Sequence, residues 1–178
     1  MKHIMLDLET MGNGNCAAIV AIGACEFNPV GSGIDSGRFY AQVSLQSSAD
    51  AGLVMDTDTV LWWLKQSDAA RKSTFEGPGQ IPLGDALCRF SKWLAGTDVA
   101  VWGNGATFDN VIIRSAYKAV GLPVPWSFRD DRCYRTMTNL LPASRRPVFE
   151  RSDTAHNALD DATTQALYLQ RVYKELGL

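Results

Sequence analysis

Hydrophobic and polar residues alternate over residues 3–10. Aliphatic side chains occupy every second position, and Met5, Asp7 and Glu9 occupy the positions between them. Successive side chains of an extended chain point to opposite faces, so a period of two is typical of a strand. The pattern predicts a first strand that carries two acids on the same face.

Two further strands are predicted over residues 17–27 and 38–45, which makes a meander of three antiparallel strands with the first. The Gly- and Ser-rich residues 28–37 between them are typical of a hairpin loop. A short apolar run over residues 98–102, followed by a Gly-Asn-Gly turn, predicts another strand. No internal repeat or low-complexity tract interrupts the chain.

Helical periodicity covers most of the remaining sequence. Apolar residues recur every three or four positions in five segments, residues 57–66, 83–95, 109–120, 133–141 and 157–175. Thr57 or Asp58 is the expected cap of the first helix. Three strands followed by alternating helices and strands predict an α/β fold with a mixed sheet flanked by helices, in a single domain over residues 1–178.

Composition limits the class of protein. A chain of 178 residues with 46% hydrophobic and 20% charged residues can bury a core, and no apolar run approaches the roughly 20 residues of a membrane span. We therefore expect a cytoplasmic protein without a membrane partner. Four cysteines without a CxxC pair predict free, mostly buried thiols. A net charge of −2 argues against a broad duplex-binding face, although it does not exclude a nuclease.

Basic residues are concentrated in one segment. Residues 129–151 hold six arginines against three acids, so this segment carries +3 and the rest of the chain −5. Such a stretch could guide a phosphate backbone towards an acidic site. A solvated charged loop is the alternative interpretation.

The pair Asp7 and Glu9 needs a counter-charge if it is buried. Two carboxylates about 4 Å apart repel by about 4 kcal/mol at an effective dielectric near 20. A divalent cation reverses the sign of that term, and carboxylate oxygens suit Mg²⁺ or Mn²⁺. The competing interpretation is a strand with two acids on its solvent face.

Other acids lie where strands and helices meet. Asp109 follows the predicted strand at residues 98–102 and is either a ligand or a helix N-cap. His156 and Asp161 flank the start of the last helix. Five residues correspond to about 140° of helical rotation, so His156 is expected on the loop before the helix. Spacing alone does not decide between Asp160 and Asp161 as a ligand.

Taken together, Asp-x-Glu on a first strand, a later Asp at a strand–helix junction and His-x₄-Asp on a last helix resemble the DEDDh, or DnaQ-like, 3'-5' exonucleases. Asp-Leu-Glu-Thr-Met-Gly, the sequence around Leu-Trp-Trp-Leu and Val-Trp-Gly-Asn-Gly-Ala-Thr-Phe-Asp-Asn are most similar to the exonuclease VIII-like and Rv2179c-like exonucleases of bacteria and phages. The likeness covers nearly the whole chain. It implies a ribonuclease H-like fold with a mixed five-stranded sheet.

The resemblance also implies the roles of the acids. Asp7, Glu9, Asp109 and Asp161 match the ligands of two divalent ions, Mg²⁺ or Mn²⁺, and Asp160 falls outside the pattern. His156 matches the general base, a role that suits an imidazole near neutral pH. Two ions about 3.5–4 Å apart stabilise both the attacking and the leaving oxygen of an in-line displacement.

Substrate contacts are expected beside these acids. The family places contacts to the terminal nucleotide at Thr10 and Met11. Stacking surfaces are expected from Phe108 and from Trp62 or Trp63, although at helical spacing one of the two tryptophans belongs to the core. Asn104 is expected to orient ligands, or else to turn the backbone.

The resulting hypothesis is hydrolysis of single-stranded DNA or RNA from its 3' end to nucleoside 5'-monophosphates. Nothing in the sequence reads a 2'-hydroxyl, so the two nucleic acids are not distinguished. The alternative is an accessory or nucleic-acid-binding module of the same fold that acts through a partner. Homodimers are common in the family, so the resemblance also implies a homodimer.

Overall fold

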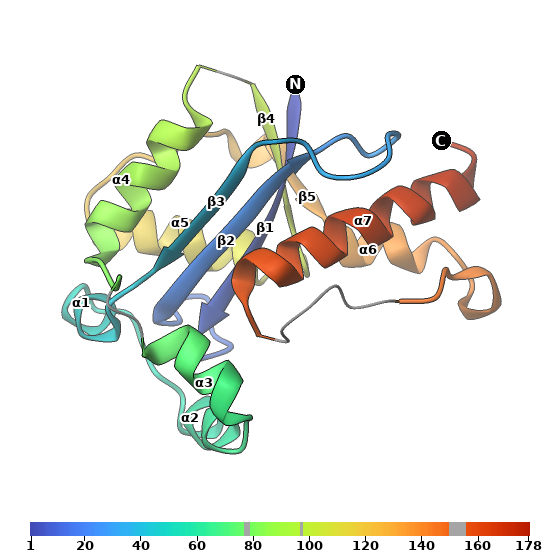
Figure 1. Ribbon diagram of the computed structural model, residues 1–178. Helices are drawn as coiled ribbons and strands as arrows, with labels where there is room; N and C mark the ends of the chain where they lie inside the picture. Colours follow the sequence, from blue (N-terminus) through green and yellow to red (C-terminus); the bar gives the residue numbers. More distant parts are fainter. Residues whose placement is uncertain (77–78, 97, 150–155) are drawn as a thin grey trace.

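The computed structural model describes residues 1–76, 79–96, 98–149 and 156–178 (Figure 1). Within these residues the strands form one five-stranded mixed sheet, ordered β3-β2-β1-β4-β5. They are β1 (Lys2–Thr10), β2 (Ile19–Phe27), β3 (Arg38–Gln42), β4 (Val99–Gly103) and β5 (Asp131–Cys133). The first three strands are antiparallel, and β4 and β5 continue the sheet in parallel with β1. The predicted mixed sheet is confirmed.

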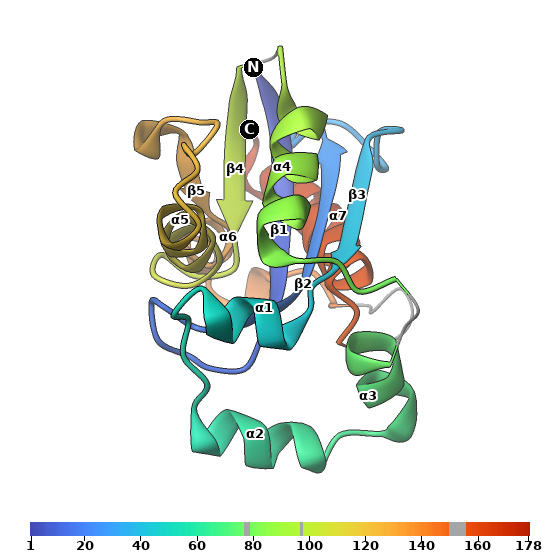
Figure 2. The same ribbon diagram turned by 90° about the vertical axis from the view of Figure 1, so that its left-hand side faces the viewer.

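Helices cover both faces of this sheet. They are α1 (Leu45–Asp50), α2 (Thr57–Leu64), α3 (Asp68–Phe75), α4 (Leu83–Leu94), α5 (Asp109–Ala119), α6 (Tyr134–Asn139) and α7 (Ala158–Leu176). Helices α4 and α5 lie on one face and α6 and α7 on the other (Figure 1), whereas α2 and α3 project beyond the end at which β1 finishes (Figure 2). None of the helices in the described residues is long and apolar enough to cross a membrane.

The alternation along β1 divides the core into two layers. Its aliphatic residues pack with α4 and α5, whereas Met5 packs with the apolar side of α7. Asp7 and Glu9 continue the Met5 row towards the end of the strand. This face of the sheet is therefore apolar around the middle of β1 and acidic at the carboxyl end of the strand, where α7 begins.

The end of the third strand and the N-cap of α2 differ from the prediction. The third strand ends at Gln42 rather than at residue 45, since Ser44 caps α1 by accepting a hydrogen bond from the Ser47 N–H. The N-cap of α2 is Asp56 and not Thr57 or Asp58. The Asp56 carboxylate instead accepts from the Asn13 N–H at 2.8 Å, which fixes the loop after β1.

The region after α5 is also more divided than predicted. Cys133 ends β5, and α6 covers only residues 134–139. The cysteines are free, as predicted, but only Cys25 is buried; Cys133 is partly exposed, and Cys16 and Cys88 are exposed, so the prediction of mostly buried thiols is wrong.

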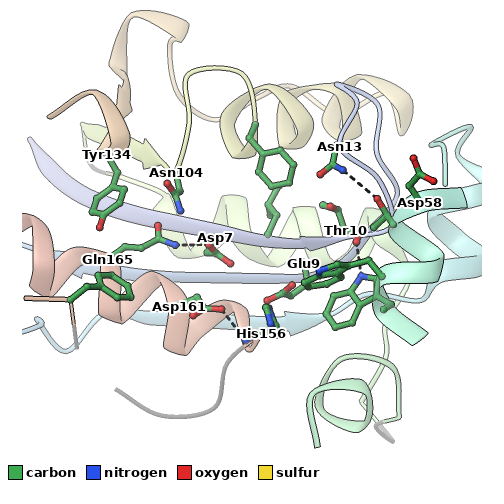
Figure 3. Close-up of a pocket in the computed structure, with 16 residues that line it drawn as sticks. Asp7, Glu9, Thr10, Asn13, Asp58, Asn104, Tyr134, His156, Asp161 and Gln165 are labelled. Carbon is green, nitrogen blue, oxygen red and sulfur yellow. Dashed lines mark hydrogen bonds between the residues drawn. The ribbon is translucent and has the colours of Figure 1, made fainter. Parts of the chain in front are cut away.

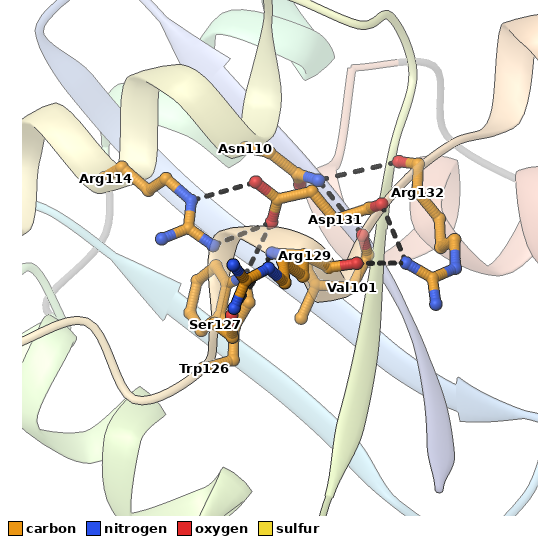
Figure 4. Close-up of polar contacts among 8 residues, drawn as sticks. All are labelled: Val101, Asn110, Arg114, Trp126, Ser127, Arg129, Asp131 and Arg132. Atoms are coloured by element: carbon orange, nitrogen blue, oxygen red, sulfur yellow. Dashed lines mark hydrogen bonds and ion pairs between the residues drawn. The ribbon is translucent and has the colours of Figure 1, made fainter.

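A polar network anchors the short edge strand β5. The Arg114 guanidinium donates to both oxygens of Asp131 at 3.0 and 2.9 Å, and the Trp126 indole donates to the same carboxylate at 2.8 Å (Figure 4). Such a bidentate pair is directional. It fixes the segment that leads into α6, and thus part of the basic stretch. Residues 150 and 151 of that stretch lie outside the described residues.

Candidate active site

A cleft of about 530 Å³ opens at the end of β1, between α2 and the start of α7 (Figure 3). Its lining includes Asp7, Glu9, Thr10, His156 and Asp161. β1 is the central strand, with neighbours on both sides, so its two acids are held on a rigid element. Asp7 and Glu9 lie early in the sequence and His156 and Asp161 lie late in it, so the site joins segments that are distant along the chain.

The cleft brings three potential metal ligands together. One ligand atom from each of Glu9, His156 and Asp161 lies within 4.8 Å of the others. Glu9 is 8% exposed, although it is a carboxylate. Asp160 is not among the residues that line the cleft. Of the two adjacent acids, it is Asp161 that faces Glu9.

Gly23 on β2 determines how closely α7 approaches the sheet. It pairs with Asp7 across the two strands, and a Cβ at this position would lie 2.1 Å from the backbone carbon of Ala158. No side chain fits in that space. The absence of a side chain at Gly23 thus lets the first turn of α7 rest on the sheet and brings Asp161 over the acids of β1.

His156 precedes α7, as expected, and its backbone is held in an unusual conformation. Its φ of 67° lies in the left-handed region. Its N–H donates to the Asp161 carboxylate at 3.1 Å, and its carbonyl accepts from the Thr74 hydroxyl at 3.2 Å. The imidazole meets Trp62 edge-on, with ring centroids 4.9 Å apart. These contacts orient the imidazole towards the cleft.

Burial raises the pKa of Asp7 well above its ordinary value. The neighbouring carboxylates of Asp109, Glu9 and Asp161 raise it further. The Gln165 amide opposes the shift by donating to Asp7 Oδ1 at 2.7 Å. Asp7 is thus close enough to each of the other three acids to be repelled by it, and a cation would offset this repulsion.

Asp109 does not line the cleft itself but lines a second hollow that adjoins it. It is the first residue of α5, whose N-cap is Phe108, so it does not cap the helix. Its two oxygens accept from the backbone N–H groups of Leu8 at 3.1 Å and Asn104 at 2.7 Å. Burial raises the pKa of Asp109 to about 6, and these hydrogen bonds limit the rise. A carboxylate has about four acceptor positions, so that of Asp109 can still offer a lone pair to a ligand.

These shifts predict how the stability of the metal-free protein depends on pH. A carboxyl whose pKa is higher in the folded than in the unfolded chain binds its proton more tightly when folded. The stability that the raised pKa of Asp109 contributes is complete below a pH of about 3.8, and it is lost as the pH rises through about 6. We expect the melting temperature in EDTA to fall across this window relative to that with Mg²⁺. An equal dependence on pH with and without Mg²⁺ in a calorimetric series would contradict it.

Most of the residues expected to contact substrate lie in the cleft. Thr10, Trp62, Trp63, Asn104 and Phe108 all line it. Trp63 is nevertheless core, at 3% exposed, and its indole donates to the Thr10 carbonyl at 3.0 Å. Trp62 is 42% exposed and offers a free face.

Met11 lies elsewhere. It is 6% exposed, belongs to the hydrophobic core and is not among the residues that line the cleft.

The cleft is also lined by three residues that were not predicted from the sequence, Gln165, Tyr134 and Asn13. A signal for Gln165 was present, because it follows Asp161 by four residues and so shares its helical face. Gln165 is buried, and its Oε1 has no partner in the described residues. No comparable pattern points to Tyr134, which reaches the cleft from the short helix α6.

Comparison with known families agrees with this arrangement. A family model described as a 3'-5' exoribonuclease Rv2179c-like domain matches residues 2–173. The chain belongs to this family. A phage T4 protein named exodeoxyribonuclease is 24% identical over 124 residues, or 64% of this chain and 54% of its own length. The matched part of the Rv2179c-like chain thus spans about half of that phage relative.

Solved structures share the fold of this Rv2179c-like chain. E. coli exonuclease I in complex with a dT13 oligonucleotide has a TM-score of 0.64 at 14% identity, over 99% of this chain and 42% of that one. The nuclease domain of 3'hExo, a DEDDh family member bound to rAMP, has a TM-score of 0.62 at 12% identity, over 97% and 92%. The resemblance to DEDDh exonucleases and the ribonuclease H-like fold are confirmed.

Proposed function

We propose that the protein is a 3'-5' exonuclease that releases nucleoside 5'-monophosphates from single-stranded DNA or RNA, with two divalent ions and with His156 as general base. One observation carries this proposal. Four acids from β1, α5 and α7 converge, and Glu9, Asp161 and His156 place ligand atoms within 4.8 Å of one another.

The residues fit divalent cations of the Mg²⁺ or Mn²⁺ type. All four acids offer hard oxygen donors, and burial together with the three neighbouring carboxylates raises the pKa of Asp7, a shift that a bound cation would oppose. Asp7, Glu9, Asp109 and Asp161 would hold the ions. When bound, such ions neutralise charge on the phosphate and the leaving oxygen and lower the pKa of water.

The protein's own groups supply orientation and proton transfer. His156 is held beside Asp161 by its backbone hydrogen bond, where its imidazole can take the proton of the attacking water. The Gln165 amide fixes Asp7 by donating a hydrogen bond to its carboxylate. The exposed face of Trp62 suits a stacked base of the terminal nucleotide.

The assay uses 5'-labelled single-stranded DNA and RNA of the same sequence, with Mg²⁺, with Mn²⁺ or with EDTA. We expect a ladder that shortens from the 3' end and is absent with EDTA. The family description names RNA and the phage relative's name indicates DNA, so the relative rates decide between the two substrates. Binding without cleavage would favour the accessory role, and early release of one labelled mononucleotide would indicate attack at the 5' end.

Two adjacent acids provide a matched pair of variants for this assay. Asp161→Asn removes an acid of the ligand cluster, whereas Asp160→Asn removes a neighbouring charge that does not line the cleft. We expect cleavage to be lost in the first and retained in the second. Comparable loss in both variants would show that the wrong acid is assigned.

A further inference from the structure

A second hollow, of about 520 Å³, adjoins the cleft on the other side of Asn104 and Phe108. The two linings have Asp7, Asn13, Asn104 and Phe108 in common, so the hollow and the cleft are adjacent parts of one surface. Asp109 and Arg135 also line the hollow. A single-stranded nucleic acid that leaves the carboxylates can therefore continue into the hollow.

The hollow differs in chemistry from the cleft. Trp62, Phe108, Tyr134 and Phe149 give the cleft several aromatic faces, which suit a base. The hollow is lined mainly by small polar residues and Arg135, with Phe108 at its border. Guanidinium, amide and hydroxyl groups are the usual partners of the sugar–phosphate backbone. The cleft thus fits a nucleoside, and the hollow fits the backbone that follows it.

Arg135 is held in place while most of its donors stay available. Its Nη2 donates to the carbonyl of Asn104 at 3.0 Å, and the Asn104 N–H donates to Asp109 at 2.7 Å. Gly105 lies next to this guanidinium and has a φ of 138°, a backbone conformation that residues with a side chain rarely adopt. In the part of the chain that the structure describes, Nε and Nη1 of Arg135 have no partner. The guanidinium is thus anchored at a fixed distance from the acids.

The other described arginines of the basic segment are engaged elsewhere. Arg132, Arg145 and Arg146 donate to backbone carbonyls, and the Arg129 guanidinium lies over the Phe128 ring, 5.3 Å from its centroid. None of these four lines the hollow or the cleft. Among its described residues, the basic segment therefore places one guanidinium, that of Arg135, beside the carboxylates.

We propose that Arg135 binds the phosphate one nucleotide upstream of the bond that is cleaved. This inference rests on the proposed 3'-5' exonuclease activity. The terminal nucleoside occupies the cleft, the scissile phosphate lies at the carboxylates, and the next phosphate on the 5' side enters the hollow. That phosphate lies beside Asp7 and Asp109 and needs a cation of its own, which the guanidinium supplies through its Nε and Nη1 donors.

Two dinucleotides that differ by one phosphate test the assignment. A dinucleotide with a 5'-hydroxyl carries only the scissile phosphate, whereas its 5'-phosphorylated form adds the upstream one. We expect the wild type to favour the phosphorylated form by roughly 10- to 100-fold in kcat/KM, as for a hydrogen bond to a charged group. This ratio should fall towards one in Arg135→Ala and stay at the wild-type value in Arg129→Ala, the matched control.

A binding measurement is independent of turnover. With Asp161→Asn protein and Mg²⁺, fluorescence anisotropy of a labelled oligonucleotide at several salt concentrations gives the number of phosphates neutralised. Adding Arg135→Ala should reduce the slope of log K against log[salt] by roughly 0.7, the value for one phosphate of a single strand. Adding Arg129→Ala should leave the slope unchanged.

The outcomes separate this inference from the proposed function. A wild-type preference near one, or an equal loss in Arg129→Ala and Arg135→Ala, would overturn the assignment of Arg135 even if the protein is an active exonuclease. Failure of the wild type to cleave any of the nucleic acids would instead overturn the proposed function. The salt slope would then still test whether Arg135 contacts a phosphate.

Discussion

Asp7→Asn is expected to lower the rate of cleavage by about 10³-fold and at the same time to stabilise the metal-free protein near neutral pH. Loss of cleavage follows because Asp7 lies among the other three acids. Metal ions contribute several kcal/mol of transition-state stabilisation, and each 1.4 kcal/mol corresponds to a factor of ten. Stability rises because the variant removes a buried carboxylate that the other three acids repel, while the amide oxygen can still accept from Gln165.

Two measurements check this expectation. Single-turnover rates with Mg²⁺ report cleavage, and calorimetry in EDTA and in Mn²⁺ reports stability. The increase in melting temperature on adding Mn²⁺ should shrink in Asp7→Asn. Asp50→Asn, at the end of α1, removes an exposed carboxylate far from the cleft and serves as the control. A variant that loses both activity and metal-free stability would show that Asp7 acts mainly through the fold.

Gly23→Ala is expected to destabilise the protein by about 2–3 kcal/mol and to reduce cleavage by roughly 100-fold. The new methyl would meet the Ala158 backbone at 2.1 Å, and overpacking of this kind costs about 1–3 kcal/mol or more. The first turn of α7 must then move away from β2 and take Asp161 and His156 with it. A misplacement of about 1 Å in a catalytic group costs on the order of 100-fold in rate.

Gly84→Ala is the matched control, because nothing lies within 4 Å of a Cβ added at that position in α4. A helical glycine gains roughly 0.5–1 kcal/mol when it becomes alanine. In thermal melts the melting temperature should therefore fall in Gly23→Ala and rise in Gly84→Ala, relative to the wild type. Single-turnover rates should fall only in Gly23→Ala. Wild-type activity in Gly23→Ala would mean that the placement of α7 does not depend on this contact.

Periodicity along the chain was sufficient to predict the parts of the fold that depend on local sequence. The alternation over residues 3–10 correctly placed Asp7 and Glu9 on one face of a strand. The offset between His156 and Asp161 correctly placed the histidine before the helix, whose N-cap is Asn157. Both depend on the geometry of a single element, which the sequence encodes directly.

Features that depend on contact between distant segments could not be predicted in this way. The role of Gly23 arises from a backbone 135 residues later in the chain, and Arg135 acquires its position through Asn104. The short helix α3 was missed for a different reason. Its eight residues are mostly polar, and Ser67 as N-cap was its main signal.

The separation of the site residues along the chain has a consequence for protein synthesis. β1 leaves the ribosome early, but Asp161 and His156 follow some 150 residues later, and α7 must fold onto the sheet before they meet Glu9. A nascent chain therefore exposes two acids without the partners that complete the ligand set. On the proposed function, the polypeptide cannot degrade the message from which it is being translated until its last helix has emerged.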